Sequence, residues 1–263
     1  VVIDHAKGCY LYDTHGKAYL DIISSWWCNL LGHANPEINA ALKQQVDELE
    51  HVIFTNFTHK PAIELARELS ELLPAGLTKF TFHDNGSSAV EAALKMAFQY
   101  QYQTGHPERT RFMCLPESYH GETIGALSVG SMDLYAKIFH PMLMNNIHFK
   151  GLDCYRCPYG KTRETCGVEC FEDAEAAFKK YGKETVACIV EPILQGAAGM
   201  RIYPAEYLRK LRMLCDEYGV LLIDDEIAAG FGRTGKLFAI EHAGVSPDIL
   251  CTSKGLTGGY LPM

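Results

Sequence analysis

Short apolar runs alternate with amphipathic segments from residue 79 to residue 254, and this alternation constrains the fold more than any other feature of the chain. The short runs are typical of buried strands, and the longer segments have the apolar spacing of helices. Because a connection between parallel strands places a helix against the sheet, the pattern predicts an α/β fold: a mostly parallel sheet flanked by helices. We expect strands at 79–83, 111–115, 185–190, 220–224 and 249–252, and helices at 87–103 and 205–218.

The N-terminal residues follow a different pattern. Apolar and polar residues alternate over 9–23 around a turn that contains Gly16, which predicts a β-hairpin. Helical spacing of apolar residues predicts helices over 36–52 and 61–73. We therefore expect residues 1–35 to be part of a small N-terminal α+β domain and residues 36–263 to form a large domain.

The composition is that of a soluble globular protein, with 48% hydrophobic and 21% charged residues among 263. A net charge of −8 argues against nucleic acid or an anionic membrane as the main partner. No apolar run approaches the roughly 20 residues of a membrane span. The ten cysteines include four inside apolar runs, which indicates a reducing, cytoplasmic protein rather than a disulfide scaffold: Cys114, Cys188, Cys215 and Cys251.

Polar residues follow three of the predicted strands, and the first group surrounds Gly86. The segment Asp84-Asn85-Gly86-Ser87-Ser88-Ala89 lies between a predicted strand and a predicted helix. Backbone N–H groups at a helix N-terminus, with serine hydroxyls beside them, suit a phosphate group. The ordinary interpretation is a helix cap, because serine and asparagine are common there.

Three acids, Asp224, Asp225 and Glu226, end the apolar strand that starts at residue 220. They lie at the carboxyl edge where α/β sheets bind ligands, so a carboxylate there could hold a metal ion or a cationic cofactor atom. A helix cap or a salt bridge is the ordinary alternative, and these residues alone leave the choice open.

Lys254 follows the last predicted strand, a common place for a lysine. Its position after the other two groups is informative, because chemistry with pyridoxal 5'-phosphate (PLP) needs a phosphate cradle, a carboxylate for the pyridine nitrogen, and a lysine that forms a Schiff base. The combination favours a PLP enzyme with Lys254 as its catalytic lysine.

Four stretches resemble the class III aminotransferases, which are PLP enzymes of fold type I: Ser118-Tyr119-His120-Gly121, Ile189-Val190-Glu191-Pro192, and the runs 225–236 and 247–254. The resemblance covers essentially the whole chain. It implies a mostly parallel sheet of the seven-stranded type, in a large domain that binds PLP.

The resemblance also implies roles for individual residues. Lys254 carries PLP covalently and moves the proton during transfer, and Asp225 pairs with the pyridine nitrogen. Gly86 and Ser87 bind the phosphate, and Tyr119 stacks on the ring. Glu191 and Glu226 organise the site through hydrogen bonds. No metal ion is expected at this site.

Within the class, Ser24-Ser25-Trp26-Trp27, followed by Gly32-His33, is similar to the aminotransferases of biotin synthesis, which act on 8-amino-7-oxononanoate. The substrate-binding residues that this implies are Trp26, Tyr119, Glu122 and Arg233. Glu122 departs from the pattern, which has an aspartate there.

The departure at Glu122 leaves open an ω-aminotransferase that acts on a diamine, γ-aminobutyrate or β-alanine. The amino donor, S-adenosylmethionine or lysine, is also left open.

Relatives of this class build each site from two subunits and extend well beyond the catalytic lysine, so the resemblance implies a homodimer and a longer chain. The sequence begins with Val1 and ends at Met263, nine residues after Lys254. We therefore expect a C-terminal portion to be missing, and a chain of this length need not turn over by itself.

The segment 151–170 is a cysteine-rich insertion. Four thiols in this short span could bind a structural zinc ion or an iron–sulfur cluster: Cys154, Cys157, Cys166 and Cys170. Ordinary turns at the prolines and glycines of the segment are the alternative. If the insertion were the functional part, the chain would be a non-catalytic metal-binding fragment.

Overall fold

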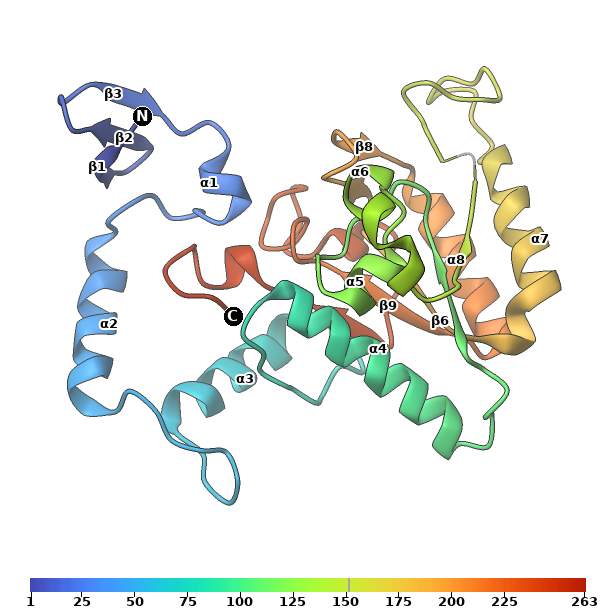
Figure 1. The fold of residues 1–263 in the computed structure, drawn as a ribbon, viewed down its shortest axis with the longest axis horizontal. Coiled ribbons are helices and arrows are strands. Elements are labelled where there is room, and N and C mark those ends of the chain that lie inside the picture. Colours follow the sequence, from blue (N-terminus) through green and yellow to red (C-terminus); the bar gives the residue numbers. More distant parts are fainter. Residues whose placement is uncertain (151) are drawn as a thin grey trace. The chain divides into compact units, whose positions relative to one another are not determined.

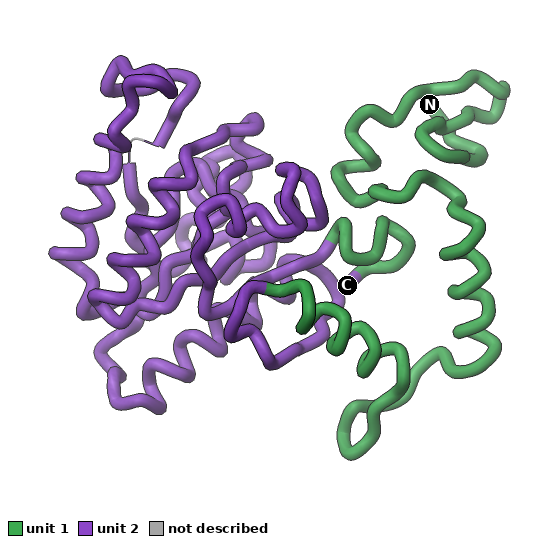
Figure 2. Tube along the Cα trace, turned by 180° about the vertical axis from the view of Figure 1, so that it is seen from behind, with its two compact units in different colours: residues 1–73, 254–262 green, residues 74–253, 263 purple. Residues whose placement is uncertain are grey.

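The computed structural model describes residues 1–150 and 152–263, and the chain divides into two compact units (Figure 2). The first unit comprises residues 1–73 and 254–262, and the second comprises residues 74–253 with Met263. The predicted boundary at residue 35 concerns the domains of the complete protein and stays a prediction. Gly151, the first residue of the predicted insertion, lies outside the described residues.

A five-stranded parallel sheet forms the centre of the second unit, in the order β10-β9-β6-β4-β5 (Figure 1). Its strands are β4 (Arg111–Cys114), β5 (Ile147–His148), β6 (Thr185–Val190), β9 (Leu221–Asp225) and β10 (Ile249–Cys251). The parallel register pairs Val190 with Asp224 and Asp225 with Cys251, so the carboxyl ends of β6, β9 and β10 meet at one edge. The predicted parallel sheet is confirmed.

Helices cover both faces of this sheet (Figure 1). On one face, α4 (Gly86–Gln103) and α5 (Ile124–Val129) pack onto β4, β6 and β9 through a fully buried apolar cluster. On the other face, α8 (Ala205–Tyr218) packs against β9 and against α7 (Glu172–Tyr181). Each helix buries only one apolar stripe, which is why the sequence shows helical periodicity there.

Shorter elements connect these layers. They are α6 (Asp133–Ala136), η1 (Lys137–Met142), η2 (Glu169–Phe171), η3 (Gly182–Glu184), β7 (Leu194–Gln195), β8 (Arg201–Ile202) and η4 (Ala239–His242).

The predicted strand over residues 79–83 is wrong. These residues form no strand, and the sheet of the described chain ends at β10 on one side and β5 on the other. A strand is defined by a ladder of hydrogen bonds to a neighbour, and local apolar alternation cannot show whether that neighbour exists. The other predicted strands of this unit lie within two residues of their predicted ends.

The first unit begins with an antiparallel sheet of β1 (Ile3–Lys7), β2 (Tyr10–Asp13) and β3 (Ala18–Leu20), which confirms the predicted hairpin. The carboxylate of Asp13 closes its turn by accepting hydrogen bonds from the N–H groups of His15 and Lys17 and from the Tyr19 hydroxyl. The N–H group of Lys17 is the main cause that lowers the pKa of Asp13.

The predicted helices of the first unit are present as α2 (Pro36–Glu48) and α3 (Lys60–Leu72). The Asn35 side chain caps α2 by accepting hydrogen bonds from the N–H groups of Glu37 and Ile38. A proline near the start of each helix has no N–H to leave unsatisfied.

The segment α1 (Ser24–Trp27) is a single turn of left-handed backbone. All four residues have positive φ, from 45° at Ser25 to 72° at Trp27. Left-handed backbone costs roughly 1–2 kcal/mol per residue that bears a side chain. Asp21 holds the turn by accepting hydrogen bonds from the Ser25 N–H and hydroxyl. Such strain is typically kept where it positions functional side chains.

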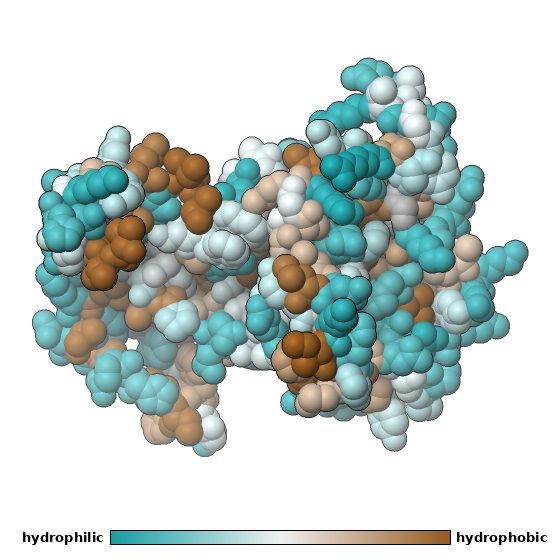
Figure 3. Space-filling view, turned by 45° about the horizontal axis from the view of Figure 1, so that its top comes forward, coloured by the Kyte–Doolittle hydropathy of each residue, from teal (hydrophilic) through white to brown (hydrophobic). Residues whose placement is uncertain are grey.

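The surface differs between the units. On the visible face of the second unit, hydrophobic groups are small and separate, whereas several gather on the first unit (Figure 3). Exposed apolar residues of the first unit include Leu20, Ile22, Ile23 and Trp26. Among the described residues, none of the helices has the length and apolar character that crossing a membrane requires.

Candidate active site

The N-terminus of α4 has features that suit an anion. Asn35 caps α2, and in the same way the Asn85 side chain caps α4 by accepting the N–H of Ser88 at 3.0 Å. The first N–H groups of a helix, here those of Gly86 and Ser87, have no partner within the helix. Together with the helix dipole they favour a phosphate group at this end. A Cβ atom on Gly86 would lie 2.9 Å from the Ile227 side chain, so glycine permits this close approach.

The loop after β4 reaches the same place. Gly121 has φ +131°, and a Cβ atom there would lie 2.2 Å from the Ser87 hydroxyl oxygen. That hydroxyl accepts a hydrogen bond from the Glu122 N–H at 3.3 Å. The loop and the start of α4 are therefore packed directly together, and Gly121 is required by the contact.

Both carboxylate oxygens of Asp225, at the end of β9, have hydrogen-bond partners. Its Oδ2 lies 2.7 Å from Nδ1 of His120, and its Oδ1 accepts the Ile227 N–H at 3.1 Å. Asp225 is 4% exposed and the His120 side chain is 0% exposed. A buried carboxylate that is held from two sides keeps a fixed orientation, which is what pairing with a protonated pyridine nitrogen requires.

Glu191 fixes the loop that follows β4 through hydrogen bonds. It follows β6, and its two carboxylate oxygens accept the N–H groups of Tyr119 at 2.9 Å and Gly196 at 3.0 Å. Burial raises the pKa of Glu191 to about 7, while the positive charge of a protonated His120 and these N–H donors act in the opposite direction. The loop from β4 thus crosses the end of β6 and reaches Asp225 at the end of β9.

Tyr119 precedes His120 in the loop after β4. Its hydroxyl donates to Glu122 at 3.3 Å, and its ring packs against Tyr135 with centroids 5.2 Å apart. Burial, followed by the charge of Glu122, raises the pKa of Tyr119 to about 12, so the hydroxyl stays protonated. The predicted residues Gly86, Ser87, Tyr119, Glu122 and Asp225 therefore come from one connected cluster of the second unit.

These residues fit PLP. The two amide N–H groups at the start of α4 suit the phosphate, and the ordered carboxylate of Asp225 suits a pyridinium nitrogen. His120 Nε2 is buried and has no partner among the described residues, so His120 is not drawn away from Asp225 by a second protein contact.

Lys254 and the paired tryptophans belong to the first unit. Nζ of Lys254 lies 5.3 Å from the centroid of the Trp27 ring, a cation–π distance. The segment that follows Lys254 packs on residues near α1: the Tyr260 hydroxyl accepts the Asn35 N–H at 2.7 Å, and a Cβ atom on Gly259 would lie 3.2 Å from that of Cys28. Trp26 is 65% exposed, so its ring is available to a ligand.

Arg233 is half-buried in the loop that follows β9. Its predicted contact with substrate stays a prediction, as do the substrate roles of Trp26, Tyr119 and Glu122.

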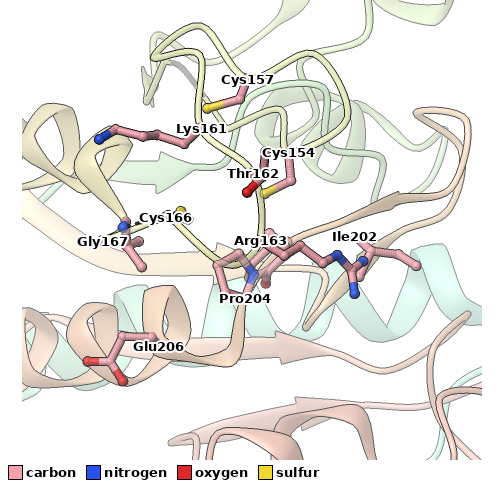
Figure 4. Close-up of a pocket in the computed structure, with 12 residues that line it drawn as sticks. Cys154, Cys157, Lys161, Thr162, Arg163, Cys166, Gly167, Ile202, Pro204 and Glu206 are labelled. Atoms are coloured by element: carbon pink, nitrogen blue, oxygen red, sulfur yellow. Dashed lines mark hydrogen bonds between the residues drawn. The ribbon is translucent and has the colours of Figure 1, made fainter.

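The cysteine-rich segment forms a separate cavity of about 310 Å³ (Figure 4). Cys154, Cys157 and Cys166 line it, and all four cysteines of the segment are free, half-buried thiols. Burial, followed by the neighbouring thiols, raises the pKa of Cys170 to about 11. Within residues 1–150 and 152–263, no three His, Cys, Asp or Glu side chains are arranged to hold one metal ion, so metal binding here stays a prediction.

Sequence reasoning gave His120 no role of its own. Its position next to Tyr119 in a recognisable stretch is the only local signal, because 105 residues separate it from Asp225.

A parallel α/β sheet with a helix start that suits an anion and a buried, histidine-held carboxylate at its carboxyl edge is the arrangement of a fold type I PLP-dependent transferase. The sequence profile described as aminotransferase class-III matches residues 1–263. The chain belongs to the class III aminotransferase family.

Relatives with established names are similar along the entire chain. An adenosylmethionine-8-amino-7-oxononanoate aminotransferase from Nitratidesulfovibrio vulgaris is 47% identical over all of this chain and 49% of its own length. The enzyme of the same name from Geobacter sulfurreducens is 45% identical over all of this chain and 58% of its own length. The chain thus spans between 49% and 58% of the length of these two relatives.

Solved structures give the same result. The adenosylmethionine-8-amino-7-oxononanoate aminotransferase of Methanocaldococcus jannaschii superposes with a TM-score of 0.91 at 40% identity, over all of this chain and 58% of that one. An (S)-enantioselective omega-transaminase from Thermomicrobium roseum superposes with a TM-score of 0.93 at 35% identity, with the same coverage.

Proposed function

We propose that the protein to which this chain belongs is a PLP-dependent transaminase of biotin synthesis, which transfers an amino group to 8-amino-7-oxononanoate and forms 7,8-diaminononanoate. The observation that carries the proposal is the sequence identity of 45–47%, along the whole chain, to two relatives that are named for this activity. Trp26 of the left-handed turn supports it, since its exposed ring offers an apolar surface to a long aliphatic substrate.

When bound, PLP supplies an electron sink that makes it easier to remove a proton beside the amino group. Asp225 would keep the pyridine nitrogen protonated, and His120 holds the Asp225 carboxylate in place. The start of α4, at Gly86 and Ser87, would bind the phosphate, and Tyr119 would pack on the ring. Lys254 would hold the cofactor covalently, and its amine would move a proton at the substrate carbon.

Substrate binding falls to side chains around this cluster. Trp26 packs against the aliphatic chain of the keto substrate, Glu122 receives the polar end beside Tyr119, and Arg233 contributes positive charge. The exposed apolar residues of the first unit fit an enzyme that acts as a homodimer, in which a second subunit covers them. The expected setting is the cytoplasm.

The test is turnover by the purified full-length protein with 8-amino-7-oxononanoate as acceptor. S-adenosylmethionine and lysine are supplied in parallel as donors, and product is measured by mass spectrometry. We expect 7,8-diaminononanoate with one of the two donors. If this acceptor is inert with every donor while the protein is yellow with bound PLP, the substrate assignment is wrong and the class is retained.

A second candidate is an ω-aminotransferase that acts on a diamine, γ-aminobutyrate or β-alanine. The structural similarity to the Thermomicrobium roseum omega-transaminase and the presence of Glu122 favour it. Activity with these amines in the same assay, without activity on 8-amino-7-oxononanoate, would select it. A colourless protein that contains zinc would instead favour the non-catalytic metal-binding alternative.

A further inference from the structure

Three consecutive acids lie at the end of β9, and all of them are buried. Asp224 is 0% exposed, Asp225 is 4% exposed and Glu226 is 0% exposed. Neighbouring side chains of a strand point to opposite faces, so Asp224 lies on the face away from Asp225. The proposed function uses only Asp225, and it leaves the other two buried acids without a role.

The hydrogen bonds of the three acids differ sharply. Both oxygens of Asp225 have partners, in His120 and Ile227. Glu226 has one engaged oxygen, Oε1, which accepts the Ile240 N–H at 2.9 Å. Its Oε2 and both oxygens of Asp224 have no donor among the described residues.

An ionised carboxylate that is buried without donors is strongly unfavourable, and such a group keeps its proton instead. Asp224 has the fewest donors of the three, so it is the one that is neutral. A buried O–H group needs an acceptor in turn, and Oε2 of Glu226 is a buried acceptor without a donor. Asp224 and Glu226 are two residues apart, so in extended backbone their side chains lie on the same side. Burial, followed by the charge of Glu226, raises the pKa of Asp224.

The titratable groups of the described chain that interact electrostatically with Asp224 supply no positive charge. They are Asp225 and Glu226 from the same strand region, Tyr203 from the segment after β8, and Cys251 from β10. The Tyr203 hydroxyl donates to the backbone carbonyl of Glu191, so it is not free to donate to Asp224. Burial raises the pKa of Glu226 to about 7, while the N–H of Ile240 acts in the opposite direction and stabilises the ionised form.

We propose that Asp224 is a protonated carboxylic acid at neutral pH and donates its O–H to Oε2 of Glu226, so that the two side chains form a positioning pair behind the cofactor carboxylate. The pair carries one shared negative charge. It ties the end of β9 to η4 through the bond from the Ile240 N–H to Glu226, and it leaves Asp225 free to face the cofactor. The pair itself does not depend on the proposed function, whereas its effect on the cofactor does.

The direct test is the infrared spectrum of the full-length protein without cofactor, as a difference between the wild type and Asp224→Asn at neutral pH. We expect the C=O stretching band of a protonated carboxylic acid to be lost in Asp224→Asn. The matched control, Asp216→Asn on the exposed side of α8, loses only a carboxylate band, because Asp216 is 67% exposed. If Asp224→Asn also loses only a carboxylate band, Asp224 is ionised and the proposal is overturned.

The acceptor is tested with Glu226→Gln. An O–H group that donates to residue 226 meets a weaker acceptor in this variant, so the acid band of Asp224 shifts in frequency. An acid band that remains unshifted would show that Glu226 is not the acceptor.

The positioning role is tested by the stability of the same protein. The amide of Asp224→Asn can still donate to Glu226, so we expect its unfolding equilibrium constant to stay within about threefold of the wild type at neutral pH. Asp224→Leu removes the donor, and we expect its unfolding equilibrium constant to be about tenfold or more above that of the wild type. Equal changes of the unfolding equilibrium constant in the two variants at every pH would contradict the hydrogen bond between Asp224 and Glu226. This comparison is independent of PLP binding and of substrate.

Discussion

Nδ1 of His120 lies 2.7 Å from Oδ2 of Asp225, and both side chains are buried. The contact joins the loop after β4 to the end of β9, across the intervening strand β6. Since Asp225 is the residue that pairs with the pyridine nitrogen in the proposed mechanism, the orientation of that carboxylate depends on a histidine that is distant in sequence.

His120→Ala removes this support. A hydrogen bond to a charged group contributes about 1.5–3 kcal/mol, so we expect the full-length protein to bind PLP at least tenfold more weakly, as measured by absorbance titration. His106→Ala is the control, because the His106 side chain is 48% exposed and its partner is the exposed Glu108. Unchanged PLP affinity in His120→Ala would show that His120 has no role in cofactor binding.

Gly121→Ala tests the contact between the loop and the start of α4. The new Cβ atom would lie 2.2 Å from the Ser87 hydroxyl oxygen, so either the loop or Ser87 must move. We expect lower stability, and PLP binding reduced by tenfold or more because the phosphate cradle is displaced.

The matched control for that change is Gly105→Ala. Gly105 also has positive φ, at +93°, but a Cβ atom there would meet nothing within 4 Å. Gly105→Ala should lower the free energy of unfolding by about 1 kcal/mol through backbone strain and leave PLP binding intact. Equal losses in the two variants would mean that strain, and not the contact with Ser87, explains the effect.

Glu191 makes stability depend on pH. Burial raises its pKa to about 7, from an ordinary value of 4.5, so the folded state binds the proton more tightly than the unfolded state. The stabilising contribution is fully present below pH 4.5 and is lost as pH rises through 7. The loss is on the order of 3 kcal/mol, from about 1.4 kcal/mol per pKa unit.

Glu191→Gln cannot titrate, so its free energy of unfolding should fall less than that of the wild type between pH 4.5 and pH 7. Urea unfolding at a series of pH values measures the difference. Glu226 titrates over the same range and remains in the variant, so a residual slope is expected. Identical slopes in the two proteins would contradict the raised pKa of Glu191.

Lys254→Ala should abolish the visible absorbance that a lysine-bound PLP gives the full-length protein, together with turnover. Lys236→Ala is the control, because Lys236 is exposed and its Nζ donates to the backbone carbonyl of Glu241 at 3.3 Å. A yellow Lys254→Ala protein with an unchanged spectrum would exclude Lys254 as the anchoring lysine.

Local patterns predicted much of this fold correctly. The apolar run at 185–190 is β6, and the amphipathic stretch at 205–218 is α8, each with the predicted ends. Both predictions succeed because the pattern of apolar residues in each segment matches its burial. β6 is buried at every position, and α8 buries one stripe. Residues 79–83 failed because a strand needs a neighbour that local pattern does not report.

The sequence by itself predicted the class of the fold and located the helix that starts at Gly86 and the acids at the end of β9, since each is visible in local residue patterns. Only the tertiary structure decided that His120 holds Asp225, which N–H groups Glu191 binds, and that Asp225, unlike Asp224, has partners for both oxygens. The physical reason is that hydrogen bonding and burial depend on which strand ends meet, and the parallel register of β4, β6 and β9 brings together residues that no local spacing relates.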